Sequence, residues 1–135
     1  MEKIKIKTII EIVGMPKEHV EKTIQKVIDI IKEKKNFELI DSKIAETKEI
    51  KGLWSTFGEF EINFPNLGDL EDFCFDFMPS SVEIISPEKL NIPSSEVENF
   101  LNDVLAKLHQ YDMAMKKIIL QQRKEQKEKK ETPSS

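Results

Sequence analysis

Apolar and polar residues alternate near the start of the chain. One face of an extended segment over residues 3–13 would carry Ile4, Ile6, Thr8, Ile10 and Ile12. A period of two predicts a strand that is buried on one side. Gly14 ends the alternation, and Pro16 stands where a first helical turn tolerates a missing N–H. Apolar residues then recur every three or four positions, which predicts a helix from about Pro16 to the Lys-rich residues 32–35.

Two further strands and a short helix are expected in the middle of the chain. Phe37 to Ile50 holds no single period, so we predict an irregular strand with a bulge or an edge position. Trp54 to Phe64 alternates again and predicts a third strand. The short helix would begin with Asp69 as its N-cap and end before Pro79. Its buried side would carry Leu70, Phe73, Cys74 and Phe77. Residues 82–85 predict a fourth strand.

The last apolar pattern is long and has a period of seven. Ser94 or Ser95 would cap a helix whose stripe is formed by Val97, Leu101, Val104, Leu108, Tyr111, Met115 and Ile118, widened by Phe100, Leu105 and Ile119. The pattern ends near Gln122, beyond which no apolar residue follows. We therefore expect three parts: a domain over 1–92, a long helix over 93–122 that packs on the domain or on a partner, and a charged, frayed tail over 123–135.

The order strand-helix-strand-strand-helix-strand predicts an α+β fold, the ferredoxin-like antiparallel sheet with both internal helices on one face. The first and third strands would be antiparallel neighbours, so that Lys5 and Lys7 meet Glu59 and Glu61 on the helix-free face. This face would also carry a modest apolar strip formed by Ile9, Val13 and Phe57. Either the final helix or a second subunit could cover it, and the sequence leaves both open.

Two short segments carry a resemblance to known families. Residues 9–16, Ile-Ile-Glu-Ile-Val-Gly-Met-Pro, and residues 81–90, Ser-Val-Glu-Ile-Ile-Ser-Pro-Glu-Lys-Leu, resemble ACT-like and related ferredoxin-like regulatory modules. The second segment is also similar to the ferredoxin-like C-terminal extension of WYL-type bacterial regulators. The resemblance implies a pairing tendency and a ligand site at the turn after the first strand. The candidate ligand turn is formed by Gly14, Met15, Pro16 and Lys17.

Charge is distributed unevenly along the chain. Residues 57–92 carry one Lys against eight acidic residues, whereas residues 116–135 carry seven basic and three acidic residues. The middle should repel phosphate and the tail should attract it weakly. The candidate nucleic-acid contacts are Lys116, Lys117, Arg123, Lys124 and Lys127. We find neither a membrane-spanning run nor a signal-peptide pattern, and we expect a cytoplasmic protein that does not enter membranes.

The residues that carry chemistry do not form a recognisable site. His19, His109 and Cys74 are too few and too dispersed for zinc, so no metal or cofactor is expected. The acidic pairs Asp72 with Asp76 and Glu59 with Glu61 are best explained as solvated charge. Gly-rich phosphate loops are absent from the sequence. These observations argue against an enzyme.

The sequence therefore favours a small non-enzymatic interaction or regulatory module. It would form a homodimer, or bind another protein, through Tyr111, Met115, Ile118 and Ile119 in the last helix, with the open sheet face as a second surface. A nucleic-acid or ribosome-associated accessory protein that uses the basic tail is the alternative. A small-ligand sensor of the ACT-like kind is the third interpretation.

Overall fold

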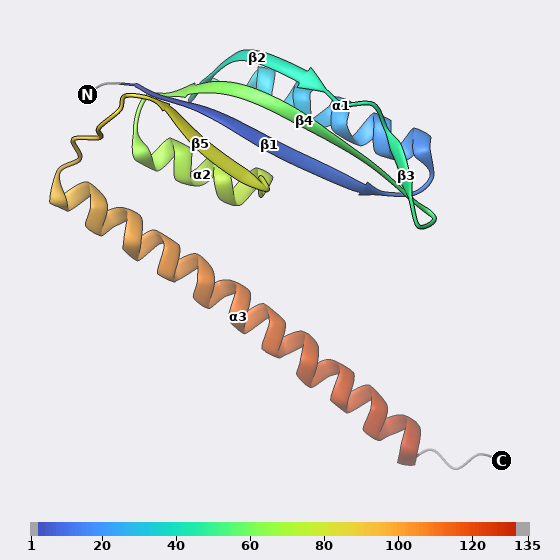
Figure 1. The fold of residues 1–135 in the computed structure, drawn as a ribbon. Helices are drawn as coiled ribbons and strands as arrows, with labels where there is room; N and C mark the ends of the chain where they lie inside the picture. The colour runs from blue at the N-terminus through green and yellow to red at the C-terminus, as the bar shows by residue number, and fades with distance from the viewer. Residues whose placement is uncertain (1–2, 132–135) are drawn as a thin grey trace. The chain divides into compact units, whose positions relative to one another are not determined.

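The computed structural model describes residues 3–131, and the chain divides into two compact units, Met1–Asn91 and Ile92–Ser135. The first unit contains β1 (Ile4–Gly14), α1 (Lys17–Glu33), β2 (Glu38–Ile44), β3 (Lys48–Ile50), β4 (Leu53–Phe64), α2 (Leu67–Phe77) and β5 (Ser81–Ser86) (Figure 1). The second unit contains α3 (Ser94–Glu131).

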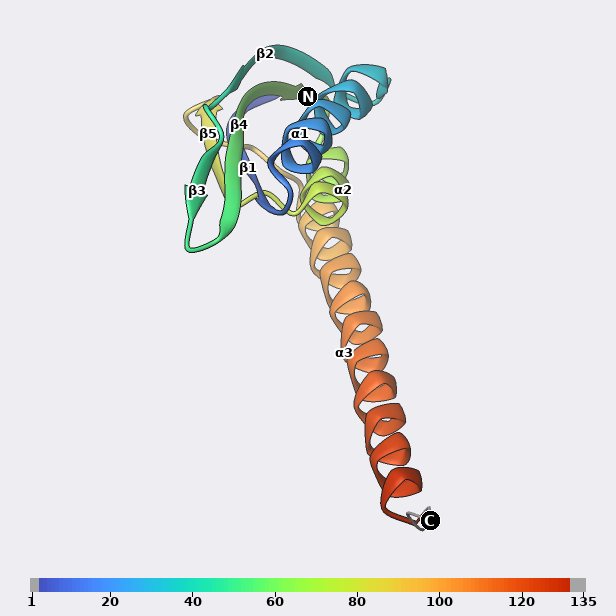
Figure 2. The ribbon, with the colours of Figure 1, turned by 90° about the vertical axis from the view of Figure 1, so that its right-hand side faces the viewer.

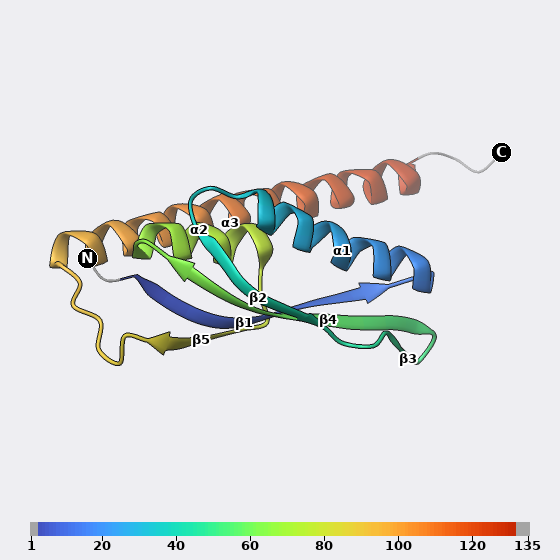
Figure 3. The same cartoon turned by 90° about the horizontal axis from the view of Figure 1, so that it is seen from above.

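The sheet of the first unit has the order β2-β4-β1-β5, all neighbours being antiparallel, and the short β3 pairs with β4. Figures 2 and 3 show α1 and α2 on the same face of this sheet. The predicted α+β, ferredoxin-like architecture with an added long C-terminal helix is thus confirmed. Its other sheet face is free of helices within the first unit.

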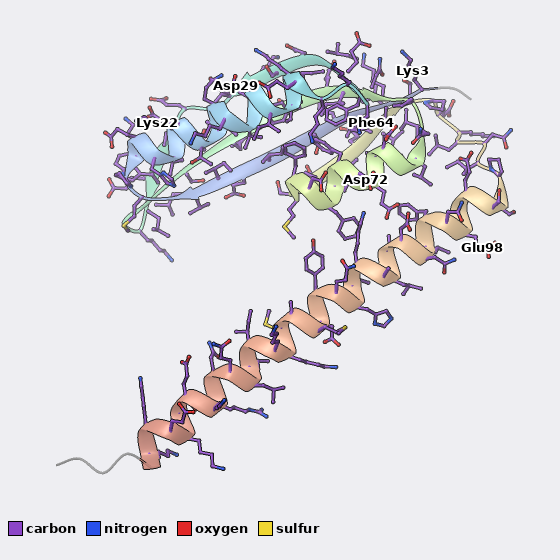
Figure 4. The ribbon with its side chains drawn as sticks, turned by 180° about the vertical axis from the view of Figure 1, so that it is seen from behind. Lys3, Lys22, Asp29, Phe64, Asp72 and Glu98 are labelled. Atoms are coloured by element: carbon purple, nitrogen blue, oxygen red, sulfur yellow. The ribbon has the colours of Figure 1, made fainter. Side chains whose placement is uncertain are left out.

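The core lies between the sheet and the two helices. Ile4, Ile6 and Ile10 of β1 are buried on the helix side, as their alternation predicts. At one end of the core the Phe37, Phe64 and Phe73 rings meet, with centroids 5.0 to 5.6 Å apart. Figure 4 shows Phe64 between the sheet and α2. Such tilted and edge-on ring pairs add to the burial of their apolar area.

Two buried threonines interrupt the apolar faces and have hydrogen-bond partners. The Thr8 hydroxyl donates to the Ser81 carbonyl oxygen at 2.7 Å, and the Thr56 hydroxyl donates to the Ala45 carbonyl oxygen at 2.8 Å. Because each buried hydroxyl donates a hydrogen bond, the desolvation cost of these polar groups is offset. Both bonds also connect a central strand to a neighbouring segment.

The irregular segment 37–50 forms two strands rather than one. The register of β2 against β4 shifts between Leu39 and Asp41, which is the bulge that the broken period predicts, and β2 is an edge strand of the sheet. A separate strand, β3, then pairs Ile50 with Leu53 across a tight turn. Lys51 and Gly52 form this turn with φ of 51° and 84°. Two consecutive left-handed residues are typical of a two-residue hairpin.

The N-cap of α2 differs from the prediction. Asn66, not Asp69, caps the helix, because the Asn66 side-chain oxygen accepts a hydrogen bond from the Asp69 backbone N–H at 2.8 Å. Asp69 therefore lies in the first turn, where its negative charge faces the positive end of the helix dipole. Gly68 is tolerated within this turn, so α2 begins earlier than the sequence pattern suggested.

The boundary predicted at residue 122 is also wrong, because α3 continues to Glu131. Only the last residues of the predicted frayed tail, 132–135, lie outside the described residues. Residues 123–131 consist of Lys, Arg, Glu and Gln, which lose little side-chain entropy in a helix. Lys–Glu pairs four positions apart support such a segment further. The end of the apolar stripe is therefore not the end of the helix.

Candidate interaction surfaces

The second unit is built on one helix, so α3 has no other described element within its own unit on which to pack. The four residues expected at an interface, Tyr111, Met115, Ile118 and Ile119, are between 40% and 57% exposed. Their spacing places them on one side of α3. Val97, Leu101, Leu105 and Leu108 continue this apolar surface toward the start of the helix and are also exposed. We call these residues, with Val104, the α3 stripe.

Basic residues gather on the side of α3 away from this stripe. All five candidate nucleic-acid contacts are exposed, and their positions in the seven-residue repeat lie outside those of the α3 stripe. The Lys116 ammonium forms an ion pair with the Asp112 carboxylate at 2.8 Å within the helix. The same helix thus presents an apolar surface and, toward its C-terminal end, a basic surface.

The helix-free face of the sheet carries the predicted cross-strand ion pairs. Lys5 Nζ lies 3.8 Å from Glu61 Oε2, and Lys7 Nζ lies 3.3 Å from Glu59 Oε1. Both pairs join diagonal neighbours, because the register sets Lys7 opposite Glu61. A hydrogen bond and the negative charge of Glu59 raise the pKa of Lys7, and Glu61 and Glu83 add to this effect. This end of the face is therefore charged but nearly neutral in sum.

The other end of the same face is apolar. Val13 and Phe57 are exposed as expected, and the hairpin of β3 and β4 adds Ile50 and Leu53 beside them. A shallow hollow at this end is lined by Glu11, Val13, Ile50, Lys51, Leu53 and Ser55. The sequence pattern did not indicate Ile50 and Leu53, because only the Lys51–Gly52 turn brings these two side chains together on this face.

The candidate ligand turn lies where β1 meets α1. Gly14 pairs with Trp54 at the start of β4, and Lys17 lies over the Trp54 ring with Nζ 5.3 Å from its centroid. Lys17 Nζ also lies 3.9 Å from Glu21 Oε1. Met15 is exposed. The turn thus places one cation beside an aromatic ring, and the Lys17 side chain already has two contacts within the unit.

The candidate catalytic and metal-binding residues are distributed over several elements. His19 lies in the first turn of α1, His109 lies in α3, and Cys74 lies half-buried in α2. Burial raises the pKa of the Cys74 thiol, and the nearby Glu71 carboxylate raises it further. A raised pKa keeps the thiol protonated and lowers its nucleophilicity at neutral pH. Glu59 and Glu61 are each paired with a lysine, as noted above.

Over residues 3–131, no group of three or more His, Cys, Asp or Glu residues is arranged to hold a metal ion. Over the same residues, no helix combines the length and the apolar character needed to cross a bilayer.

Comparison with curated proteins finds the uncharacterized protein MJ0538 of Methanocaldococcus jannaschii, which is 39% identical over 105 residues. The aligned region is 76% of this chain but 38% of that protein, so the chain spans less than half the length of its relative. The model of the MJ0538 family matches residues 5–134, which cover nearly all of both units. On the strength of this match, the chain belongs to the MJ0538 family.

Proposed function

We propose that this chain is a non-enzymatic interaction module that associates with copies of itself through the α3 stripe. The observation that carries the proposal is the exposure of a continuous apolar surface on a helix that has no other described element in its unit. A contiguous apolar surface of this kind on an otherwise charged chain is typical of an interaction site. The charge of the helix-free sheet face is already compensated, which makes α3 the stronger of the two predicted surfaces.

The energetics of a single helix support the same conclusion. A helix in a protein gains most of its stability from packing its apolar face, and not from intrinsic helix propensity. Each Å² of apolar surface removed from water contributes roughly 25 cal/mol. Complete burial of one large side chain such as Met115 is accordingly worth about 1.5–3 kcal/mol. Self-association supplies this burial because each copy presents the same stripe.

The test compares two methionines on opposite sides of α3. Met115 belongs to the stripe, whereas Met113 is 70% exposed and lies on the other side. Sedimentation equilibrium should give a mass above the 15.7 kDa of one chain, and Met115→Lys should weaken association at least tenfold, about 1.4 kcal/mol. Met113→Lys should leave association unchanged. A wild-type mass of one chain at every concentration would reject the proposal.

A second function is favoured by the basic surface of α3. Because these cations lie away from the stripe, a nucleic acid could contact them while the stripe is covered. Such binding would be sequence-independent and would weaken steeply with salt. The variant Arg123→Gln/Lys124→Gln/Lys127→Gln keeps good helix formers and should strongly weaken retention on immobilised RNA at low salt. Unchanged retention by this variant argues against the second function.

A further inference from the structure

The residues of the α3 stripe occupy defined positions of a coiled-coil repeat. Spacings of three and four alternate along the stripe, so Leu101, Leu108 and Met115 fall at position a of the heptad. Position d is occupied by Val97, Val104, Tyr111 and Ile118. A repeat of this kind lets the seam of one helix face the seam of another over its whole length.

The residues that flank the seam are complementary in a parallel arrangement. In a parallel, in-register assembly, a residue at position g meets the residue five places later, at position e of the neighbouring copy. The resulting pairs are Phe100 with Leu105, Lys107 with Asp112, Ala114 with Ile119 and Gln121 with Gln126. Apolar residues meet apolar residues, a cation meets an anion, and an amide meets an amide. Each flanking pair is therefore compatible.

Antiparallel arrangements do not give such matches, because there g meets g and e meets e. In the register that sets Leu108 of one helix opposite Tyr111 of the other, Leu105 of one helix lies against Asp112 of the other. A shift by one heptad in one direction places Lys107 of one helix against Lys107 of the other. A shift by one heptad in the other direction places Asp112 of one helix against Asp112 of the other. Like charges in contact destabilise the two shifted registers, and the first register sets a carboxylate against an apolar side chain, so all three are penalised.

The identities at a and d indicate the number of copies. Two-stranded parallel coiled coils prefer β-branched residues at a and Leu at d, whereas Leu at a with Ile at d favours three or four strands. In α3, Leu predominates at a and β-branched residues predominate at d: position a carries Leu101, Leu108 and Met115, and position d carries Val97, Val104, Tyr111 and Ile118. The apolar surface also widens onto e and g through Leu105 and Phe100. Such width suits a bundle in which flanking positions become buried.

We infer that α3 assembles three or four copies of this chain into a parallel, in-register bundle. The inference rests on the proposed self-association and adds its orientation and copy number. The inferred number of copies is larger than the two of the homodimer that the sequence pattern of the stripe suggests. Since the first unit precedes α3 in every copy, a parallel bundle attaches all copies of the sheet at the same end of the helices.

The test uses the full chain with a matched pair of engineered cysteines. In a Cys74→Ser background, Gln122→Cys places a thiol at position a, and Gln110→Cys places one at the outward position c. Under mild oxidation Gln122→Cys should form disulfides between copies, because equivalent a positions adjoin in a parallel bundle. Gln110→Cys should remain largely reduced. Sedimentation equilibrium of the wild type should give three or four times 15.7 kDa.

The outcomes separate this inference from the proposed function. A wild-type mass of one chain rejects both. A mass of two chains leaves self-association standing and overturns the copy number. A multimer in which Gln122→Cys does not cross-link, or cross-links no faster than Gln110→Cys, overturns the parallel register.

Discussion

The inner face of β1 and the stripe of α3 are made of the same kinds of residue but differ in exposure. Ile4 and Ile6 of β1 are fully buried, whereas Leu101 and Leu108 of α3 are each 53% exposed. Both segments are regular in pattern and continuous in structure. The difference lies in what each unit offers: α1 and α2 cover one face of the sheet, but no second element among the described residues of its own unit covers α3.

An apolar pattern shows which surface of a helix or strand must be buried, but it does not show whether the same chain or another chain covers that surface. In the first unit the need is met within about ninety residues, whose core holds interlocking rings and branched aliphatic side chains. In the second unit the same need becomes an association surface. Substitutions on the two patterns should accordingly affect different measurements: folding for the sheet, and assembly for the helix.

The largest expected effect comes from Phe60, which is fully buried in β4. Phe60→Ala should lower the free energy of unfolding by about 3–5 kcal/mol, because it removes buried area and leaves a cavity. Trp54 is the only tryptophan and lies in the same strand, so its fluorescence in guanidinium reports this unit. Leu108→Ala in α3 should leave the Trp54 transition unchanged while weakening self-association.

A control for Phe60→Ala lies on the opposite face of the same strand. Phe57 is 45% exposed, so Phe57→Ala should cost under about 1 kcal/mol. An equal loss from both variants would show that the helix-free face is covered as completely as the core. If that loss appeared only at high protein concentration, a second copy of the chain would be what covers the helix-free face.

The next effect concerns a close approach inside the core. A Cβ on Gly58 would lie 2.5 Å from Phe60 Cζ and 3.3 Å from Ile24 Cδ1. Gly58→Ala should therefore lower the free energy of unfolding by about 1–3 kcal/mol through overpacking. Adding Phe60→Leu makes room, so the double variant should be more stable than the sum of the two single losses predicts. Strict additivity in chemical unfolding would contradict this account.

Much of the first unit could be predicted because its signals are local. The alternation in residues 3–13 identifies the buried face of β1, and the order of elements places β1 beside β4. These two facts together predict the ion pairs of Lys5 and Lys7. The bulge in β2 also follows from the sequence, since the alternation there breaks.

The remaining features depended on conformations that the sequence signals weakly. Lys51 adopts a left-handed φ, a conformation that Asn or Gly at this position would have indicated more clearly. The hairpin was therefore not predicted, nor was the position of Ile50 on the outer face of the sheet. Asn66 and Asp69 are both good N-caps, and only the structure distinguishes them. The stripe of α3 was recognised, but the sequence pattern is the same whichever surface covers it.

The smallest expected effect is electrostatic and belongs to the exposed sheet face. Lys7 gains a raised pKa from Glu59 on folding, so its stabilising effect is present below its ordinary pKa of 10.5 and is lost as pH rises through the folded value. Lys7→Gln should lower the midpoint of Trp54-monitored unfolding slightly at pH 7 and low salt. The difference from wild type should shrink in 1 M salt and as pH rises through the raised pKa of Lys7, since salt screens the pair and deprotonation removes it. Lys26→Gln, on the exposed side of α1, should show neither dependence. A Lys7→Gln effect that is the same at every salt concentration and pH would assign this side chain a packing role instead.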